Sequence, residues 1–520
     1  MPRTFLVLLL ALHTLAATRA YGGVDLPLHH WAYEAIERLT AMGRIDRAML
    51  GSKPYSRKEA AKYVAQATQK ARTDGIADLL LDRLTREFRA ELAGLEPGAV
   101  RYGARVQTEV DAASIGAEQE VRFRENRGGE YWVDGVQIQA DARAWLEVND
   151  WAALTVQPKF ISDSHILGMG ATENTDTFYV REASLKISHF NVALELARGS
   201  LWWGQGYRGS LLLTDHAFPL DMIKLGSDEA FRLPGWFAKL GEWKVQTFLA
   251  QLERERDFPR AKLFGARLSY LPAGWLELGL TRLTLFNGEG RDQSFPSAVF
   301  DAYFDKPNQG GELEVNEQAM LDFRVTIPRG RYLPLPAGLQ LYGELGSEDK
   351  WSKPRPSRGA YLAGLYIPQL FAGDTTDLRI EYADTDFTRR NSGIPQVWYN
   401  NATYQSGMRH RGFVLGHHMG TDGTDFFVRV TRYMSDRIQL GASFNIQERD
   451  RGQAVHETKD EAAIDLTWWV SASMQFTVGY AYQRLKNPGQ ITDTNPFVET
   501  FAAGVSTDNH LVWTRFAVEF

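Results

Sequence analysis

A run of strict alternation between apolar and polar residues constrains this chain more than any other feature. From Val136 to Val148, valine, isoleucine, alanine and leucine occupy every second position, and mostly charged or amide residues lie between them. A period of two with one apolar and one polar face predicts a half-buried β-strand. The run is long for a strand of a globular protein, but its length suits a tilted strand that crosses a membrane.

The same pattern recurs along most of the chain. It runs from Ala462 to Trp468, returns from Phe476 to Tyr482 after a short turn, and ends the sequence from Val512 to Phe520. We count about 18 such segments, a number within the range of bacterial outer-membrane barrels. The sequence therefore predicts an all-β transmembrane barrel of about 18 antiparallel strands. A soluble β-sandwich or pair of propellers would explain the alternation, but not the long strands or the absence of a repeat.

One predicted strand departs from the pattern. Residues Leu276–Leu280 keep their leucines on one face, but Arg282 falls next on that face. The apolar residues then move to the opposite face, at Leu283 and Leu285. We expect either a β-bulge or an exit from the membrane near Arg282.

The chain divides into three regions. The basic Arg3, the apolar run Phe5–Leu12 and the small residues after it predict a signal peptide over residues 1–20. A small helical periplasmic domain, the head, is expected over 21–98, and the outer-membrane barrel over 99–520. Export without a single cysteine fits a Gram-negative-type cell envelope.

Helical periodicity predicts three helices in the head. Gly43 ends the first, the capping box Ser56–Glu59 starts the second, and an apolar stripe from Ile76 to Leu92 marks the third. The first two helices resemble one S-layer homology motif, beginning at His30–Ala32. That resemblance implies binding to peptidoglycan or a linked polymer, and a helical plug at the periplasmic mouth of the barrel is the alternative.

Composition and motifs argue against several functions. The absence of cysteine excludes disulfides, thiolate metal sites and cysteine nucleophiles. The formal charge of −6 becomes −8 without Arg3 and Arg19, which argues against nucleic acid as a partner. Gly204, Gly206 and Gly209 match a dinucleotide fingerprint, but no parallel strand precedes them and no helix follows. We expect no catalytic residues, no cofactor, no metal and no enzymatic activity.

Several blocks lie in order across residues 100–430: Trp202–Gly204, Gly209–Leu211, Leu263–Leu268, Trp275–Leu280, Gly288–Arg291, Leu341–Glu344, Glu348–Asp349, Glu381–Thr385, Tyr404–Gly412 and Gly416–His417. Together they resemble the Wzi family of capsule-assembly outer-membrane proteins. That resemblance implies a barrel of about 18 strands with a periplasmic helical bundle. It also implies a lectin-like role, holding capsular or related extracellular polysaccharide at the cell surface. Outer-membrane lipid is the other expected partner, and peptidoglycan or a polysaccharide exporter are further candidates.

Aromatic and charged residues in the predicted loops suit polysaccharide binding. Flat rings stack on sugar faces, and forked arginine donors bind hydroxyls or uronates. A structural role, as charge ladders inside the lumen, is the alternative for each residue. The candidates are Trp202, Trp203, Tyr207, Arg208, Glu289, Arg291, Arg409 and Arg411.

Two other classes of function stay open. A carbohydrate-selective porin anchored to the cell wall would have an open lumen. Long loops and inward-facing arginines and glutamates that fill the lumen would oppose it. An outer-membrane enzyme acting on lipid or glycan would need a nucleophile with a base within reach, and no spacing in the sequence nominates one.

Overall fold

The computed structural model describes most of the chain. The residues described are 23–72, 75–93, 100–116, 125–130, 132, 134–148, 151–164, 175–291, 315–327, 335–348, 359–373, 375–386, 397–471, 473–491 and 499–520. The predicted signal peptide lies outside them. Within these residues, no helix is both long and apolar enough to cross a bilayer.

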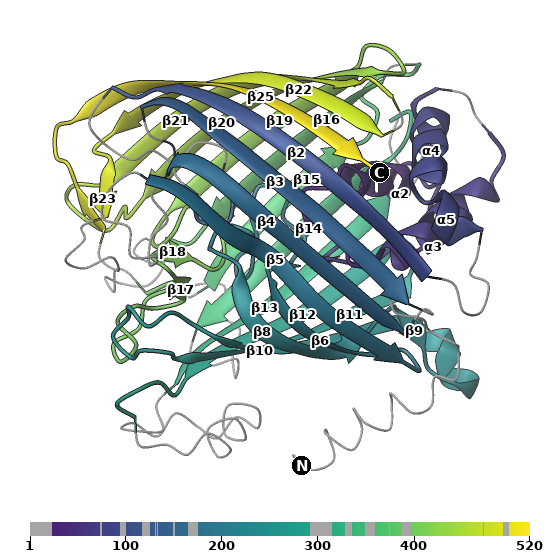
Figure 1. Ribbon diagram of the computed structural model, residues 1–520, viewed down its shortest axis with the longest axis horizontal. Helices are drawn as coiled ribbons and strands as arrows, with labels where there is room; N and C mark the ends of the chain where they lie inside the picture. The colour runs from purple at the N-terminus through teal and green to yellow at the C-terminus, as the bar shows by residue number, and fades with distance from the viewer. Residues whose placement is uncertain are drawn as a thin grey trace.

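The described strands close into an antiparallel barrel with 18 strand positions, in which β9 continues β8 along β10 (Figure 1). Neighbours in sequence pair throughout, and β2 closes the barrel against β25. The predicted fold class is confirmed. The strands are β2 Val100–Ser114, β3 Gly135–Val148, β4 Ala152–Ser164, β5 Thr175–His189, β6 Val192–Gly199, β8 Leu220–Ser227, β9 Phe231–Arg232, β10 Glu242–Gln251, β11 Lys262–Ala273, β12 Leu276–Phe286, β13 Asn316–Ile327, β14 Leu339–Glu348, β15 Gly359–Ile367, β16 Thr376–Asp384, β19 Thr424–Tyr433, β20 Ile438–Arg449, β21 Glu457–Trp469, β22 Met474–Lys486 and β25 Ser506–Glu519.

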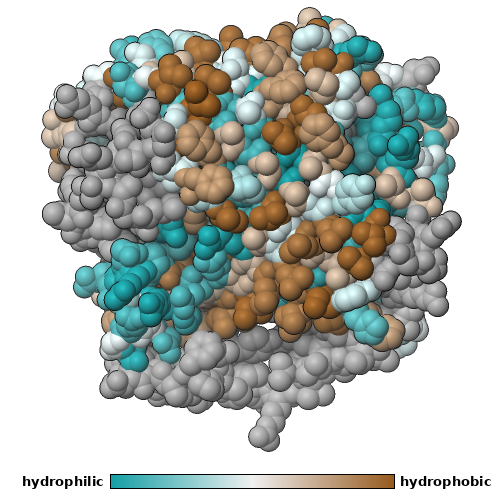
Figure 2. Space-filling model, viewed as in Figure 1, coloured by the Kyte–Doolittle hydropathy of each residue, from teal (hydrophilic) through white to brown (hydrophobic). Residues whose placement is uncertain are grey.

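Along most of the barrel wall, the apolar face of the strands points away from the lumen. On β3, Val136 and Ile138 are 57% and 49% exposed, whereas the intervening Gln137 is 1% exposed. Figure 2 shows apolar side chains spread over the outward face of the visible strands. Exposed aromatic residues such as Trp151, Phe190 and Trp275 follow the short turns at one end. An apolar belt bounded by aromatic residues is the outer surface of a membrane barrel.

The structure contains no bulge at Arg282, so that part of the expectation is wrong. Pairing of β12 with both neighbours continues in register through this residue. Arg282 lies on the outward face and forms an ion pair with Glu317, as expected where the strand leaves the apolar belt. Leu283 and Leu285 are fully buried because the lumen beside them is filled.

The described residues of the head form four helices at the end of the barrel where the chain ends (Figure 1). They are α2 Ala32–Ala41, α3 Arg57–Thr68, α4 Ile76–Glu87 and α5 Arg89–Leu92. Ser56 caps α3 by accepting from the amide of Glu59, as predicted. The predicted third helix is broken at the buried Phe88, which leaves helical geometry.

Short elements connect these parts. Strand β1 (Ser52–Lys53) of the head pairs with β7 (Trp202–Trp203), which lies in the loop between β6 and β8. Strands β17 (Arg409–His410) and β18 (Phe413–Val414) form a hairpin in the loop between β16 and β19. The remaining pieces are β23 (Gly489–Ile491), β24 (Glu499–Phe501) and the 3-10 helix η1 (Gly235–Leu240).

Candidate functional site

The eight candidate residues separate into two groups of four. Trp202, Trp203, Tyr207 and Arg208 belong to residues 200–219, which enter the barrel between β6 and β8 and which we call the lumen plug. Strand β7 of the plug pairs with β1 of the head, with Trp203 opposite Ser52 and Trp202 opposite Lys53. The plug and the head therefore meet inside the barrel. The other four residues lie in long loops at the end opposite the head.

Two glutamates of the barrel wall hold the plug by its backbone. Glu344 on β14 accepts hydrogen bonds from the amides of Gly206 and Leu211, both at 2.8 Å. Glu381 on β16 accepts from the amides of residues 207–208, at 2.7 and 2.8 Å. Each such hydrogen bond contributes about 0.5–1.5 kcal/mol net. The two carboxylates thus fix the turn of the plug.

The head is held in the same way from its own end. Glu277 on β12 accepts from the amides of Leu50 and Gly51, at 2.9 and 3.0 Å. Glu147 on β3 accepts from the amide of Val24 at 2.6 Å. Inward-facing glutamates therefore bind the backbone of the segments that fill the lumen.

The lumen around the plug is an apolar core. Trp203 is 1% exposed, and its ring centroid lies 5.3 Å from that of Phe248 on β10. Leucines 211–213 of the plug join Leu283 and Leu285 of the wall in one buried cluster. Side chains that face a water-filled channel would be polar, so this half of the lumen is built like a protein interior.

The glycines of the plug serve close packing. A Cβ on Gly206 would lie 1.8 Å from the carbonyl oxygen of Gly209. Gly204 has a φ of +142°, and a Cβ there would meet Ser210 at 2.2 Å. Their spacing is required by a tight turn against the barrel wall, which explains the fingerprint without a nucleotide.

Tyr207 and Arg208 make specific contacts inside the lumen. The Tyr207 hydroxyl donates to Glu34 of α2 at 2.9 Å, and the Arg379 guanidinium lies 4.2 Å from its ring centroid. The Arg208 guanidinium lies 5.1 Å from the ring centroid of Phe427. Burial and these contacts tie both residues to the plug, the head and the wall.

Glu289 and Arg291 lie in the loop that follows β12. Glu289 forms an ion pair with Arg260 at 2.9 Å, and both side chains are about half exposed. The Arg291 guanidinium lies 5.1 Å from the ring centroid of Phe258 and 5.2 Å from that of Tyr404. Exposed charge beside aromatic rings is the chemistry that the sequence predicted for sugar binding.

Arg409 lies in β17 and Arg411 in the turn of the β17–β18 hairpin, and they differ in their partners. Arg409 donates to Asn400 at 2.7 Å. Arg411 has a φ of +50°, followed by +82° at Gly412, so these two residues form a type I′ turn. The Arg411 guanidinium lies 3.9 Å from the ring centroid of Phe218. Its Nε and Nη1 have no hydrogen-bond partner among the described residues. Burial, then the like charge of Arg198, lower the pKa of Arg411.

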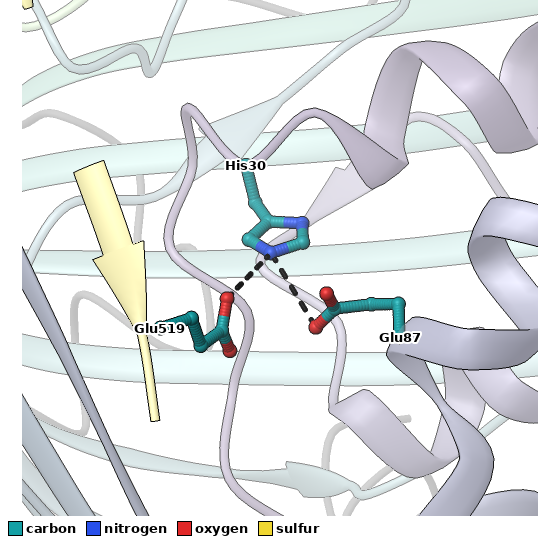
Figure 3. A group of neighbouring side chains, drawn as sticks. All are labelled: His30, Glu87 and Glu519. Carbon is teal, nitrogen blue, oxygen red and sulfur yellow. Dashed lines mark ion pairs between the residues drawn. The ribbon is translucent and has the colours of Figure 1, made fainter. Parts of the chain in front are cut away.

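A separate polar cluster joins the head to the last strand (Figure 3). The Nε2 atom of His30 lies 3.7 Å from Glu87 and 3.8 Å from Glu519. Its Nδ1 accepts the backbone N–H of Ala32, so in the neutral ring Nε2 carries the proton. That tautomer cannot ligate a metal through Nε2, and Arg57 already binds both carboxylates. The cluster is an ion-pair contact between head and barrel.

Comparisons with known proteins identify the family. The family model described as capsule assembly protein Wzi matches residues 105–496. The chain belongs to the Wzi family. The predicted resemblance is confirmed, and the barrel is an outer-membrane barrel. An S-layer homology motif in the head remains a prediction.

The chain is also similar to individual proteins. A solved structure of Wzi, described as a carbohydrate-binding β-barrel involved in group 1 capsule assembly in Escherichia coli, aligns with a TM-score of 0.69 and 17% identity. The alignment covers 96% of this chain and 99% of that one, which establishes the fold. A 55.8 kDa protein in the cps region of Klebsiella pneumoniae is 29% identical over 259 residues, 49% of this chain. The chain spans about half the length of that curated relative. The OccAB2 barrel of Acinetobacter baumannii gives a TM-score of 0.45 at 9% identity, over 81% of this chain and 98% of that one.

Sequence reasoning missed the wall glutamates Glu147, Glu277, Glu344 and Glu381. Each occupies an inward position of an alternating strand. From the alternation alone, a glutamate at such a position is interpreted as part of a charge ladder. Glu344 and Glu381 also lie within the blocks that resemble the Wzi family. Glu344 and Glu381 face no basic residue in register on either neighbouring strand, which was the available signal that their partners come from elsewhere.

Proposed function

We propose that this protein binds and organises capsular or other extracellular polysaccharide at the cell surface, without catalysing a reaction. Family membership supports a role in capsule assembly. The carbohydrate binding described for the Escherichia coli relative supports the ligand class.

The observation that carries the proposal is the filled lumen. The plug packs its apolar side chains against strands β10–β15, and wall carboxylates bind its amides. A polymer that cannot pass through the barrel has to be held outside it. The same filling counts against the porin alternative, in which a hydrated pore has to cross the membrane.

We propose that the binding surface is formed by the long loops and that the head lies in the periplasm. Short turns on the head side support this orientation, because bacterial barrels have short periplasmic turns and longer external loops. Of the eight candidates, Glu289, Arg291, Arg409 and Arg411 lie at the external end. Arg291 and Arg411 are the best placed, since the guanidinium group of each lies over an aromatic ring at this end. Trp202, Trp203, Tyr207 and Arg208 would act indirectly, by holding the plug.

The test measures the affinity of the purified protein for acidic oligosaccharides from the capsule of the cell that makes it. Neutral oligosaccharides of equal length provide the comparison. We expect Arg291→Ala or Arg411→Gln to weaken binding of the acidic ligand by about 1.5–3 kcal/mol, or about 10- to 100-fold. Arg484→Gln is the matched control, because Arg484 is exposed and paired with Asp508 on the outer wall. Equal affinity of all variants would contradict this assignment of the surface.

Retention of polysaccharide on cells tests the role itself. A strain without the protein is expected to release more polysaccharide into the medium, and the wild-type gene to restore attachment. Unchanged retention in that strain would contradict the proposed function, even if the purified protein binds the oligosaccharide.

A further inference from the structure

One connection at the head end of the barrel differs from its neighbours. Two-residue turns, 190–191 and 274–275, join β5 to β6 and β11 to β12. Residues 233–241 join β9 to β10 and include the 3-10 helix η1, drawn as the teal coil beside β9 in Figure 1. Such an insertion is longer than the turn requires.

The apolar side chains of η1 face solvent. Trp236, Phe237 and Leu240 are 67%, 43% and 39% exposed, and none of them belongs to a buried cluster of the described residues. The rings of Trp236 and Phe237 stack with centroids 3.9 Å apart. Large apolar side chains gathered on one short segment mark a surface that contacts an apolar partner.

The position of η1 identifies that partner. The hydroxyl of Tyr270 on β11 donates to the carbonyl of Leu240 at 2.7 Å. Tyr270 also stacks on Trp243 of β10, with centroids 4.0 Å apart. Both rings are on the outward face, because the adjacent Ser269 and Lys244 point inward to contact the head. The helix therefore continues the lipid-facing belt.

A glycine and the charged residues beside η1 also fit a position on the lipid-facing belt. A Cβ on Gly241 would lie 2.3 Å from the carbonyl oxygen of Leu271, so this glycine lets the end of η1 lie close against the wall. Lys239 is exposed within η1, and the half-exposed Arg232 just before it forms an ion pair with Glu242. Aromatic residues with an adjacent cation such as Lys239 suit the boundary between acyl chains and anionic headgroups.

We propose that η1 is a membrane-interface anchor, with Trp236, Phe237 and Leu240 inserted among phospholipids of the leaflet nearest the head. The anchor would fix the depth and tilt of the barrel on this side. Interfacial helices of this kind bind through buried apolar area and attraction to anionic lipid.

The absence of cysteine makes a direct test possible. Trp236→Cys is labelled with a nitroxide and reconstituted, one protein per nanodisc, in phosphatidylethanolamine and phosphatidylglycerol. Its accessibility to oxygen and to a water-soluble nickel chelate is compared with that of two reference labels. Leu225→Cys reports the apolar belt, since Leu225 is 50% exposed on β8. Thr68→Cys reports water, since Thr68 is exposed at the end of α3.

We expect the label at 236 to lose most of the collisions with the chelate that the label at 68 shows, and to collide with oxygen as the label at 225 does. Accessibility to the chelate equal to that at position 68 would overturn the proposal. Protection that appears only when two copies share a nanodisc would also overturn it, because the occupant would then be a second copy of this chain.

Discussion

Glu37 of the head helix α2 binds Arg379 of the barrel strand β16, with Oε2 and Nη2 2.8 Å apart. Its other oxygen pairs with Arg324 on β13. One buried carboxylate thus pairs with two arginines of the wall and joins the head to the barrel.

Glu37→Gln is expected to destabilise the docked head by about 3–5 kcal/mol, because it leaves two buried guanidinium groups without their counter-charge. Denaturant unfolding in detergent micelles, followed by protease cleavage of the head, measures the change. Asp82→Asn removes an exposed partner of Arg72 and should cost no more than about 1 kcal/mol. Equal losses for the two variants would contradict the role of Glu37.

We expect low pH to release the head from the barrel. Burial alone would raise the pKa of Glu37, but Arg379 and then Arg324 lower it to about 2. Because the folded pKa is below the ordinary value, the contribution of Glu37 is fully present above about pH 4.5 and is lost as pH falls toward about 2. Head cleavage measured across this range should rise more steeply for the wild type than for Glu37→Gln. Parallel curves would exclude Glu37 as a source of the acid sensitivity.

His417 should make the loops opposite the head sensitive to mild acid. Burial, followed by the charge of His418, holds the pKa of His417 well below its ordinary value. The unfolded segment takes up a proton near pH 6.5 and the folded one does not, so stability is lost as pH falls below that value. Hydrogen exchange at residues 415–420, corrected for intrinsic rates, should increase between pH 7.5 and 5.5. His417→Phe should reduce that increase, and His510→Gln, on the outer wall, should leave it unchanged.

Gly206→Ala is expected to displace the plug, because its Cβ would lie 1.8 Å from the carbonyl oxygen of Gly209. Overlap with backbone cannot be relieved by a rotamer change, and we expect a cost of at least about 1–3 kcal/mol. Gly199→Ala is the control, since a Cβ there meets nothing within 4 Å. The melting temperatures of the two variants provide the comparison, and similar values would show that the tight turn is not required.

Conductance reports whether the plug seals the barrel. The wild-type protein in a planar bilayer should show no large steady conductance. Replacement of residues 201–213 by a short glycine–serine linker should produce one, because it removes the apolar core around Trp203. Steady conductance of the wild type would favour the porin alternative over the proposed function.

The sequence predicts the barrel well because the alternation of apolar and polar residues within a strand is enough to predict that strand. The alternation from Val136 to Val148 reports which face meets lipid, whatever the other strands do. The helices of the head are equally local, and the cap at Ser56 lies within the residues that predict it. The break at Phe88 was not predictable, since the apolar stripe continues through it.

The contents of the lumen could not be predicted from local patterns. Glu344 accepts a hydrogen bond from the amide of Gly206, which lies 138 residues away in the sequence. No local pattern around either residue predicts this contact. Trp202 and Trp203 looked available for sugar binding because an aromatic pair in a loop has the same composition whether it faces solvent or a core. Whether the aromatic pair faces solvent or a core depends on the path of the loop, and contacts with the barrel wall determine that path.

The pairing of β1 with β7 has a mechanical consequence. The plug is bonded to the loops opposite the head through Thr214 and Leu415, at 2.9 Å, and to the head through Gly204 and Gly51, also at 2.9 Å. A load applied to the loops by an attached polymer would pass along this chain of hydrogen bonds to the far side of the membrane. The plug inside the barrel thus connects the two faces of the bilayer mechanically, because each of its ends is hydrogen-bonded to structure on one face.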